Sequence, residues 1–273
     1  MLKKLSIVAL ALSLLLLPAL ACQPQQIALE LQLKGLTGKI KQAVQIELNN
    51  TDLDLSNAAA ELSRTGLSGD EARNILNELV VKHPFIIDTC TTDLTVKMVT
   101  VAPDAYRQHE GTDISTQDVM IKFMETKQPM LSQMFPAVEG VDGVIIIWPV
   151  VSQDGEFMGS VSAFFKPETL FATLCMPEIK GTGIAIDVMQ LDGLDIYDSR
   201  GNDTGVNLFT DPASQQYTEL VALGHRMVAE ESGSGSYTNI DHDTGQMVKK
   251  QAYWDTIQLH GTAWRLMLNH IIE

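Results

Sequence analysis

The chain has 273 residues, and its 34 acidic against 19 basic side chains give a formal net charge of -15 at neutral pH. Binding to nucleic acid requires clustered Lys and Arg, and the sequence holds no such cluster, so we expect no nucleic-acid partner. Hydrophobic residues make up 45% of the chain and charged residues 19%. This composition excludes a wholly disordered protein and suits one large domain or two medium ones.

The first 21 residues have the composition of an export signal. Lys3 and Lys4 precede an apolar run from Leu5 to Leu17, and Ala19-Leu20-Ala21 forms a small-residue cleavage site before Cys22. A retained transmembrane helix is the weaker interpretation, because the apolar run is short for the hydrocarbon core of a bilayer. We therefore expect an exported chain, at the outer face of the cell membrane or in the periplasm.

Cys22 follows Ala-Leu-Ala directly, which resembles the lipobox of bacterial-type lipoproteins, although Ala19 replaces the usual Leu. The resemblance implies lipidation of Cys22 and a lipid anchor in the membrane. The alternative is ordinary cleavage that leaves a free thiol, but a lone exposed thiol is unusual in an oxidising compartment. With Cys22 lipidated, Cys90 and Cys175 would form either a disulfide or two buried thiols.

Two helices are predicted ahead of the strand-rich part of the chain, and with the tether they make up residues 22–84. Apolar residues recur every three or four positions from Gln26 to Arg64, which predicts one long helix or a broken pair. A second helix is predicted from Ser68-Gly69-Asp70-Glu71, which has the pattern of a capping box. This helix must end before Pro84.

Residues 85–176 have the pattern of a small α/β unit. Two β-hairpins are predicted, with strands at 85–90 and 96–101 and at 143–151 and 157–165. Gln153-Asp154-Gly155 gives the second hairpin the strongest turn signal in the chain. Helices are predicted at 116–126 and 167–174, and residues 176–183 are expected to form a linker.

Residues 177–273 repeat this organisation. Strands are predicted at 184–190, 194–197, 235–238, 246–256 and 263–268, and a helix at 214–230. We expect the Gly/Ser stretch 232–236 to be a loop. The acid-rich segment from Asp192 to Asp203 lacks the spacing of an EF-hand, so we expect surface turns there. The predicted class is α+β, with two sheet units after the N-terminal helices.

Several segments resemble extracellular Cache sensor domains. In the first half these are Val101 to Ser115, Ile147-Trp148-Pro149-Val150 and Asp154 to Ser162; in the second half they are Val188 to Gly193, Gly205 to Phe209 and Gly261-Thr262-Ala263-Trp264. Their order is similar to that of double Cache proteins over nearly the whole chain after the export signal. The resemblance implies a long N-terminal helix carrying two PAS-like units, each an antiparallel β-sheet flanked by helices.

The resemblance also implies that residues 85–176 form a membrane-distal unit that binds a small ligand, and residues 177–273 a membrane-proximal unit. In histidine kinases and chemoreceptors of this family, binding is passed through the long helix to a transmembrane helix. We see no such helix or output domain after the export signal, and expect a stand-alone, lipid-anchored sensor. Gln117 and Asp118 stand where amino-acid-sensing relatives place an Arg and an aromatic residue, which argues against an amino-acid ligand.

Eight residues are candidates for the ligand site, because they lie on the predicted cover of the first sheet, residues 113–135, or at neighbouring loop and inward strand positions. They are Tyr106, Gln117, Asp118, Met134, Phe135, Trp148, Val150 and Ser162. Structural roles compete with this interpretation. Met134, Phe135 and Val150 suit an ordinary core, while Asp118 suits a solvated first helical turn.

No catalytic motif is apparent: the sequence has no Gly-x-Ser-x-Gly elbow, His-Glu-x-x-His helix or phosphate loop. We therefore expect no enzyme, no cofactor and no metal site. The favoured hypothesis is a sensor that binds a small molecule and signals through a membrane kinase or chemoreceptor. The alternatives are a solute-binding lipoprotein that delivers its ligand to a transporter, and a structural homodimer, joined through the N-terminal helix, that binds no ligand.

Overall fold

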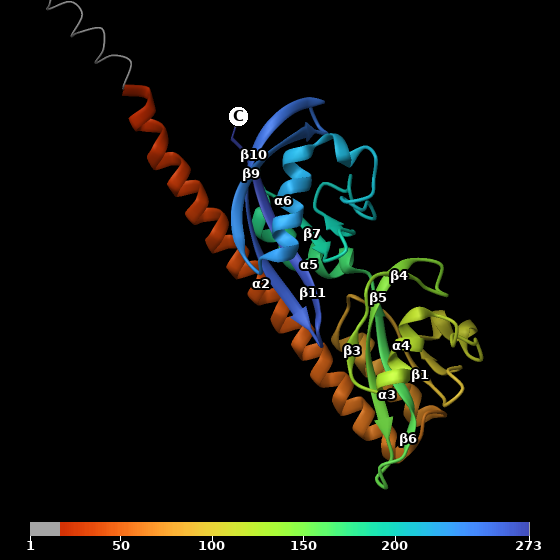
Figure 1. Ribbon diagram of the computed structural model, residues 1–273. Helices are drawn as coiled ribbons and strands as arrows, with labels where there is room; N and C mark the ends of the chain where they lie inside the picture. Colours follow the sequence, from red (N-terminus) through yellow and green to blue (C-terminus); the bar gives the residue numbers. More distant parts are fainter. Residues whose placement is uncertain (1–16, 273) are drawn as a thin grey trace, which may run out of the picture.

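The computed structural model describes residues 17–272, with side chains from residue 27 onward. Most of the predicted export signal and the side chain of Cys22 lie outside these described parts. Figure 1 shows one long helix, α2, with two sheet units arranged one after the other along it. No helix within residues 17–272 combines the length and the apolar character needed to cross a bilayer.

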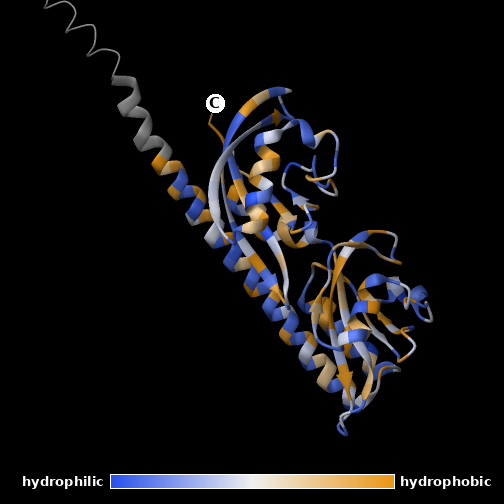
Figure 2. Ribbon diagram, in the orientation of Figure 1, coloured by the Kyte–Doolittle hydropathy of each residue, from blue (hydrophilic) through white to orange (hydrophobic). Residues whose placement is uncertain are grey.

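Helix α2, Leu17–Thr65, is continuous over 49 residues, so the prediction of one long helix is confirmed and the broken pair is wrong. Gly35 and Gly38 lie within it without ending it. Buried apolar residues recur at spacings of four and seven: Leu33, Ile40, Val44, Leu48, Leu55 and Leu62. Such spacing places them on one side of the helix. Figure 2 shows polar and apolar residues alternating along α2, as expected for a helix with one buried face.

Helix α3, Asp70–Lys82, ends before Pro84 as predicted. Its beginning differs from the prediction, because the N-cap residue is Gly69 and no side chain caps the first turn, so the expected capping box is wrong. Gly69 has a φ of 91°, a conformation that glycine adopts without steric cost.

The first unit contains a six-stranded antiparallel sheet in the order β2-β1-β6-β5-β3, with β4 paired to β5. The strands are β1 Ile86–Thr92, β2 Met98–Ala102, β3 Met130–Leu131, β4 Phe135–Pro136, β5 Asp142–Val151 and β6 Phe157–Phe165; the helices are η1 Asp104–His109 and α4 Asp118–Thr126. Both predicted hairpins are confirmed, as β1–β2 and β5–β6. The two-residue strands β3 and β4 were not predicted, because they are too short to show a period.

Helix α5, Pro167–Ile179, connects the units and is longer than predicted. It continues through Pro177, where the sequence suggested a linker, and the expected boundary at residue 176 lies inside it. The missing N–H of Pro177 removes only one hydrogen bond near the end of the helix. Cys175 on α5 and Cys90 on β1 are both free and buried. Of the two alternatives left open for this pair, the structure has the two buried thiols and not the disulfide.

The second unit has a five-stranded antiparallel sheet in the order β8-β7-β11-β10-β9. Its elements are β7 Ala185–Gln190, β8 Asp195–Asp198, η2 Ser214–Gln216, α6 Thr218–Ala229, β9 Gly233–Asp241, β10 Gln246–Leu259 and β11 Thr262–Ile271. The expected loop at 232–236 is wrong, since β9 begins at Gly233. A Cβ on Gly233 would lie 2.4 Å from the Trp254 ring, so glycine here allows a close approach of ring and strand.

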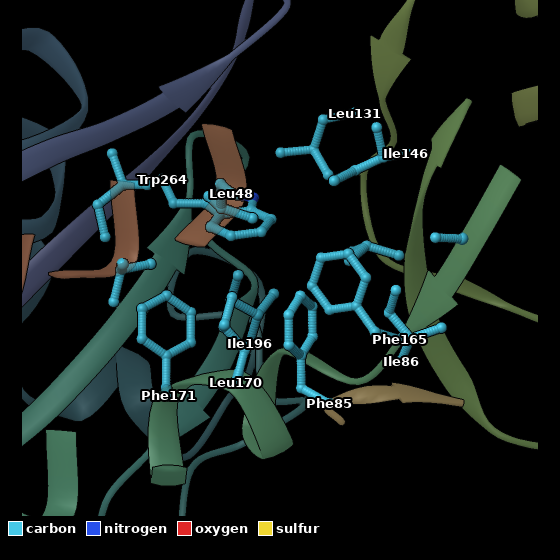
Figure 3. Packing of buried hydrophobic residues seen from close by; sticks show 14 of the residues in the cluster. Leu48, Phe85, Ile86, Leu131, Ile146, Phe165, Leu170, Phe171, Ile196 and Trp264 are labelled. Carbon is cyan, nitrogen blue, oxygen red and sulfur yellow. The ribbon is translucent and has the colours of Figure 1, made fainter. Parts of the chain in front are cut away.

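One apolar cluster joins α2 to both units. It includes Leu48 of α2, Phe165 of the first sheet and Trp264 of the second sheet, all of them buried. Figure 3 shows these side chains with Phe171 of α5 among them, and the ring centroids of Phe171 and Trp264 are 6.0 Å apart. Two smaller clusters lie elsewhere, one including Phe123 of α4 and the other Met227 of α6. The two units therefore share a core.

Asp52 of α2 lies at a polar junction of the helix and the two units. The Trp148 indole N–H, from β5, donates a 2.6 Å hydrogen bond to Asp52 Oδ1, and His260 Nε2, from the turn before β11, lies 2.6 Å from the same oxygen. Two more bonds of 2.6 Å join the units directly: Thr262 Oγ1 donates to the Leu131 carbonyl, and the Met134 N–H donates to Gln190 Oε1.

Candidate ligand-binding site

The eight predicted site residues do not gather around one cavity. Gln117, Phe135 and Ser162 line a small cavity of about 30 Å³ between the first sheet and α4. A space of this size holds about two water molecules. These three residues are the part of the prediction that the fold brings together.

Core packing or an interface accounts for three of the other candidates. Trp148 donates its N–H to Asp52, Val150 is completely buried, and Met134 packs against the cluster shared by the two units. The remaining two lie near the surface. Tyr106 stacks on His109 with ring centroids 6.3 Å apart, and Asp118 is the exposed first residue of α4. A role for these five residues in ligand binding stays a prediction.

A carboxyl group of the first unit that the sequence did not single out lies in the small cavity. Asp88 on β1 is 2% exposed, and its Oδ2 has no hydrogen-bond partner in the described structure. Burial, together with the nearby charge of Glu139, raises the pKa of Asp88 to about 8. Burial therefore favours the protonated form of Asp88, which can donate a hydrogen bond.

Replacing Asp88 with Asn should make stability less sensitive to pH. Between 3.8 and about 8 the folded chain keeps a proton on Asp88 that the unfolded chain has lost. The folded state then binds more protons, so the unfolding free energy falls as the pH rises, by up to about 1.4 kcal/mol per pH unit for one group. In urea unfolding, we expect D88N to be more stable than the wild type at pH 8 and similar to it near pH 4.

The exposed Asp154, on the turn between β5 and β6, supplies a matched control. D154N should follow the wild type at both pH values. Identical pH profiles for D88N and the wild type would show that Asp88 ionises in the folded chain much as it does in water.

A second cavity, of about 310 Å³, lies in the second unit. Residues of β7, β9, β10 and β11 form its floor, and the segment between β8 and α6 covers it. A concave space of this volume above an antiparallel sheet is of the size that small ligands occupy. We expected a sheet under a loop-and-helix cover to enclose the ligand cavity in the first unit. In the structure, the same arrangement encloses a cavity of about 310 Å³ in the second unit and only about 30 Å³ in the first.

Carboxylates lie along one side of this cavity. Asp187 Oδ2 accepts a 2.6 Å hydrogen bond from the Asn269 amide, and Asp195 Oδ1 accepts the Tyr197 N–H at 2.9 Å. Burial and the charge of Asp198 raise the pKa of Asp187 to about 7. Burial and the charge of Asp187 raise the pKa of Asp195 well above its ordinary value. A bound cation would favour the ionised form of both groups.

The opposite side of the cavity carries a buried amine. Lys250 on β10 is 5% exposed, and within the described residues it has neither an ion pair nor a hydrogen bond. Its Nζ lies 5.9 Å from the centroid of the Tyr237 ring on β9. Burial lowers the pKa of Lys250, while the charge of Asp187 acts in the other direction.

Two amide groups of the cavity wall also lack partners. The Oδ1 atoms of Asn239 and Asn269 are buried without a hydrogen bond in the described structure. Buried polar atoms without partners are rare in folded proteins. Lys250, Asn239 and Asn269 are therefore polar residues of the wall whose hydrogen bonds the described protein does not complete.

Sequence reasoning missed this site. Asp195, Asp198 and Asp203 were expected in surface turns, yet all three line the cavity. A usable signal exists in the strands, because Asp187 and Lys250 interrupt otherwise apolar or small inward positions. A charged residue at such a position is a stronger sign of a site than an acidic residue in a turn.

Comparisons with known proteins agree with the fold. Residues 46–167 match the family described as "HK/GC/Chemotaxis protein-like, sensor domain". No curated protein sequence matches the chain. An extracellular ligand-binding receptor from Desulfohalobium retbaense is 34% identical with a TM-score of 0.75, over 88% of this chain and 40% of that one. The chain therefore spans about two fifths of that receptor's length.

Two further solved structures share the fold at low identity. The extracellular domain of rpHK1S-Z16, a provisionally assigned histidine kinase, is 13% identical with a TM-score of 0.70, over 90% of this chain and 96% of that one. The ligand-binding domain of the chemoreceptor CtaA from Pseudomonas fluorescens, solved with L-alanine, is 14% identical with a TM-score of 0.65, over 90% and 98%. The predicted fold and the resemblance to double Cache domains are confirmed.

Proposed function

We propose that the chain binds a small molecule outside the cell membrane and reports occupancy to a membrane protein, because residues 46–167 match a sensor-domain family of the histidine kinase and chemotaxis type and the fold is shared with extracellular ligand-binding domains. The partner would be a sensor kinase or a chemoreceptor. The chain itself would have no enzymatic activity.

One observation carries this proposal: the second unit has a preformed cavity of about 310 Å³ whose wall holds polar groups without protein partners. The predicted site in the first unit, around Gln117 and Ser162, would accept a ligand only if its cavity of about 30 Å³ opened. Binding in the membrane-distal unit is therefore a second proposal, which depends on movement of α4 and the segment that follows it.

The contacts around Asp52 support a route from either unit to α2. A ligand shifts an equilibrium between two arrangements only by its difference in affinity for them. Because α2 contacts both units, a change in the packing of either sheet would alter the contacts that hold the helix. A lipid anchor at Cys22 would place the second unit near the membrane, since this unit packs beside the N-terminal half of α2 (Figure 1). A homodimer formed through α2 is a further proposal.

A thermal-shift screen tests the proposed function. The full chain in mild detergent would be heated with carboxylic acids, amines, amino acids, sugars and nucleobases. A ligand that binds only the folded state adds about 2.7 kcal/mol of stability at 100 times its Kd, so we expect a dose-dependent rise in Tm for at least one class. A flat screen, together with native mass spectrometry that detects no co-purified compound, would contradict a ligand-binding function.

A further inference from the structure

Two carboxylates and one amine of the second-unit cavity lie on three different strands. Asp187 lies on β7 and Asp195 on the neighbouring β8, whereas Lys250 lies on β10. Strand β11 separates β7 from β10, and two strand spacings amount to about 10 Å. The Lys250 Nζ lies 5.9 Å from the centroid of the Tyr237 ring on β9.

Other charged groups of the wall are already used within the protein. Asp198 accepts the backbone N–H groups of Arg200 and Asn202, each at 2.8 Å, and so holds the turn after β8. Arg200 lies 3.6 Å from Asp241. In contrast, Asp187 and Asp195 each use only one oxygen within the described structure, and the ammonium of Lys250 has neither a hydrogen bond nor an ion pair there, only the contact with the Tyr237 ring.

Lys250 is the observation that points to a ligand independently of the carboxylates. It is 95% buried, as its 5% exposure shows, and it lines the cavity. An ammonium in so buried a residue is costly without a hydrogen-bond acceptor, and an acceptor group placed in the cavity would offset that cost. A cation placed beside the partly buried Asp187 and Asp195 would likewise favour their ionised forms.

Part of the cavity wall is apolar. Met189 of β7, Met227 of α6 and Met267 of β11 line the cavity, and all three are buried. Methionine side chains adapt well to a flexible hydrocarbon chain. An α-amino acid carries both of its charged groups on one carbon, so it could satisfy only one side of the cavity. A molecule with a short carbon chain between its two polar ends could satisfy both.

We propose that the second-unit cavity binds a small dipolar molecule, with a protonated amine held by Asp187 and Asp195 and an anionic or acceptor group, several bonds away, held by Lys250. This inference rests on the proposed sensor function and names the ligand class of that function. The carbon chain between the two groups lies against the three methionines.

Four five-carbon compounds test the proposal by isothermal titration calorimetry on the full chain in mild detergent. They are 5-aminopentanoate, its α-amino isomer norvaline, pentylamine and pentanoate. We expect 5-aminopentanoate to bind at least about tenfold more tightly than each of the others, because only it makes charge-assisted hydrogen bonds on both sides. Norvaline has the same atoms, so composition cannot explain a difference between the two.

Variants assign each end of the ligand to its side of the cavity. D195N and D187N should each weaken 5-aminopentanoate and pentylamine about tenfold. K250M should weaken 5-aminopentanoate and pentanoate by a similar factor but leave pentylamine unchanged. D243N, at an exposed position on the turn between β9 and β10, and D88N, in the first unit, are the matched controls and should bind like the wild type. Far-UV circular dichroism would establish that each variant is folded.

The outcomes separate this inference from the proposed function. Equal binding of norvaline and 5-aminopentanoate, or affinity for 5-aminopentanoate that survives both D195N and K250M, would overturn the ligand class. The ligand class would also be overturned if a compound of another class bound in the wider screen and D195N did not change its affinity. The sensor function would then stand. If no probe and no compound of the wider screen binds, the proposed function fails as well.

Discussion

Replacing Trp264 with Ala is expected to lower the unfolding free energy by about 3–5 kcal/mol, the usual cost of removing a large buried aromatic side chain. Trp264 is completely buried in the cluster shared by α2 and both units, and its ring lies beside Phe171. Its indole N–H has no hydrogen-bond partner in the described structure. Trp264→Phe keeps an aromatic ring and removes that unpaired donor, so we expect a clearly smaller loss.

Urea unfolding followed by tryptophan fluorescence and by far-UV circular dichroism would measure both variants. Trp148 reports on the first unit, while Trp254 and Trp264 report on the second. Because one core joins the units, the two signals should change together in the wild type and in both variants. A separate early transition of the second unit in W264A would show that the shared cluster does not couple the units.

Replacing Gly159 with Ala is expected to cost about 3–5 kcal/mol or to prevent folding, because it combines backbone strain with a clash. Gly159 on β6 has a φ of 147°, and a Cβ there would lie 1.9 Å from the carbonyl oxygen of Thr92. That oxygen belongs to the paired strand β1, so relief requires the sheet itself to shift. The variant would be measured by urea unfolding, and by the soluble fraction if it does not fold.

Gly155→Ala is the control for the conformational part of this effect. Gly155 also has a positive φ, 85°, but a Cβ there meets no atom within 4 Å. We expect a loss of about 1–2 kcal/mol from the left-handed conformation alone. If G159A and G155A lost the same stability, the contact with Thr92 would contribute nothing.

The fold was largely predictable because its signals are local. The helical period of α2, the change of period after Pro84 and the turn at Asp154-Gly155 each identified an element that the structure contains. The errors occurred where tertiary contacts override local preference. Gly233 and Gly235 look like a loop in the sequence, but they lie in strand β9. Glycine is needed there because Trp254 and Leu223 occupy the space that side chains would take.

The site was predictable only in part, because a cavity depends on contacts between distant residues. Trp148 was a reasonable candidate from its chemistry, yet its N–H is used by Asp52, which lies 96 positions earlier in the chain. Nothing in the local pattern around either residue indicates this pairing. The carboxylates of the second-unit cavity were visible in the sequence, but their depth beneath the segment between β8 and α6 was not.

The length of α2 has a mechanical consequence. At 1.5 Å per residue, its 49 residues make a rod of about 70 Å. Both units contact this rod at Asp52, and the second unit also contacts it at Lys41, whose Nζ lies 2.7 Å from Asp255 Oδ1. The rod can therefore act as a lever, since a tilt of about 5° about one end carries the other end through about 6 Å. A partner near residue 17 could thus detect a bound ligand as a displacement, without contacting either cavity.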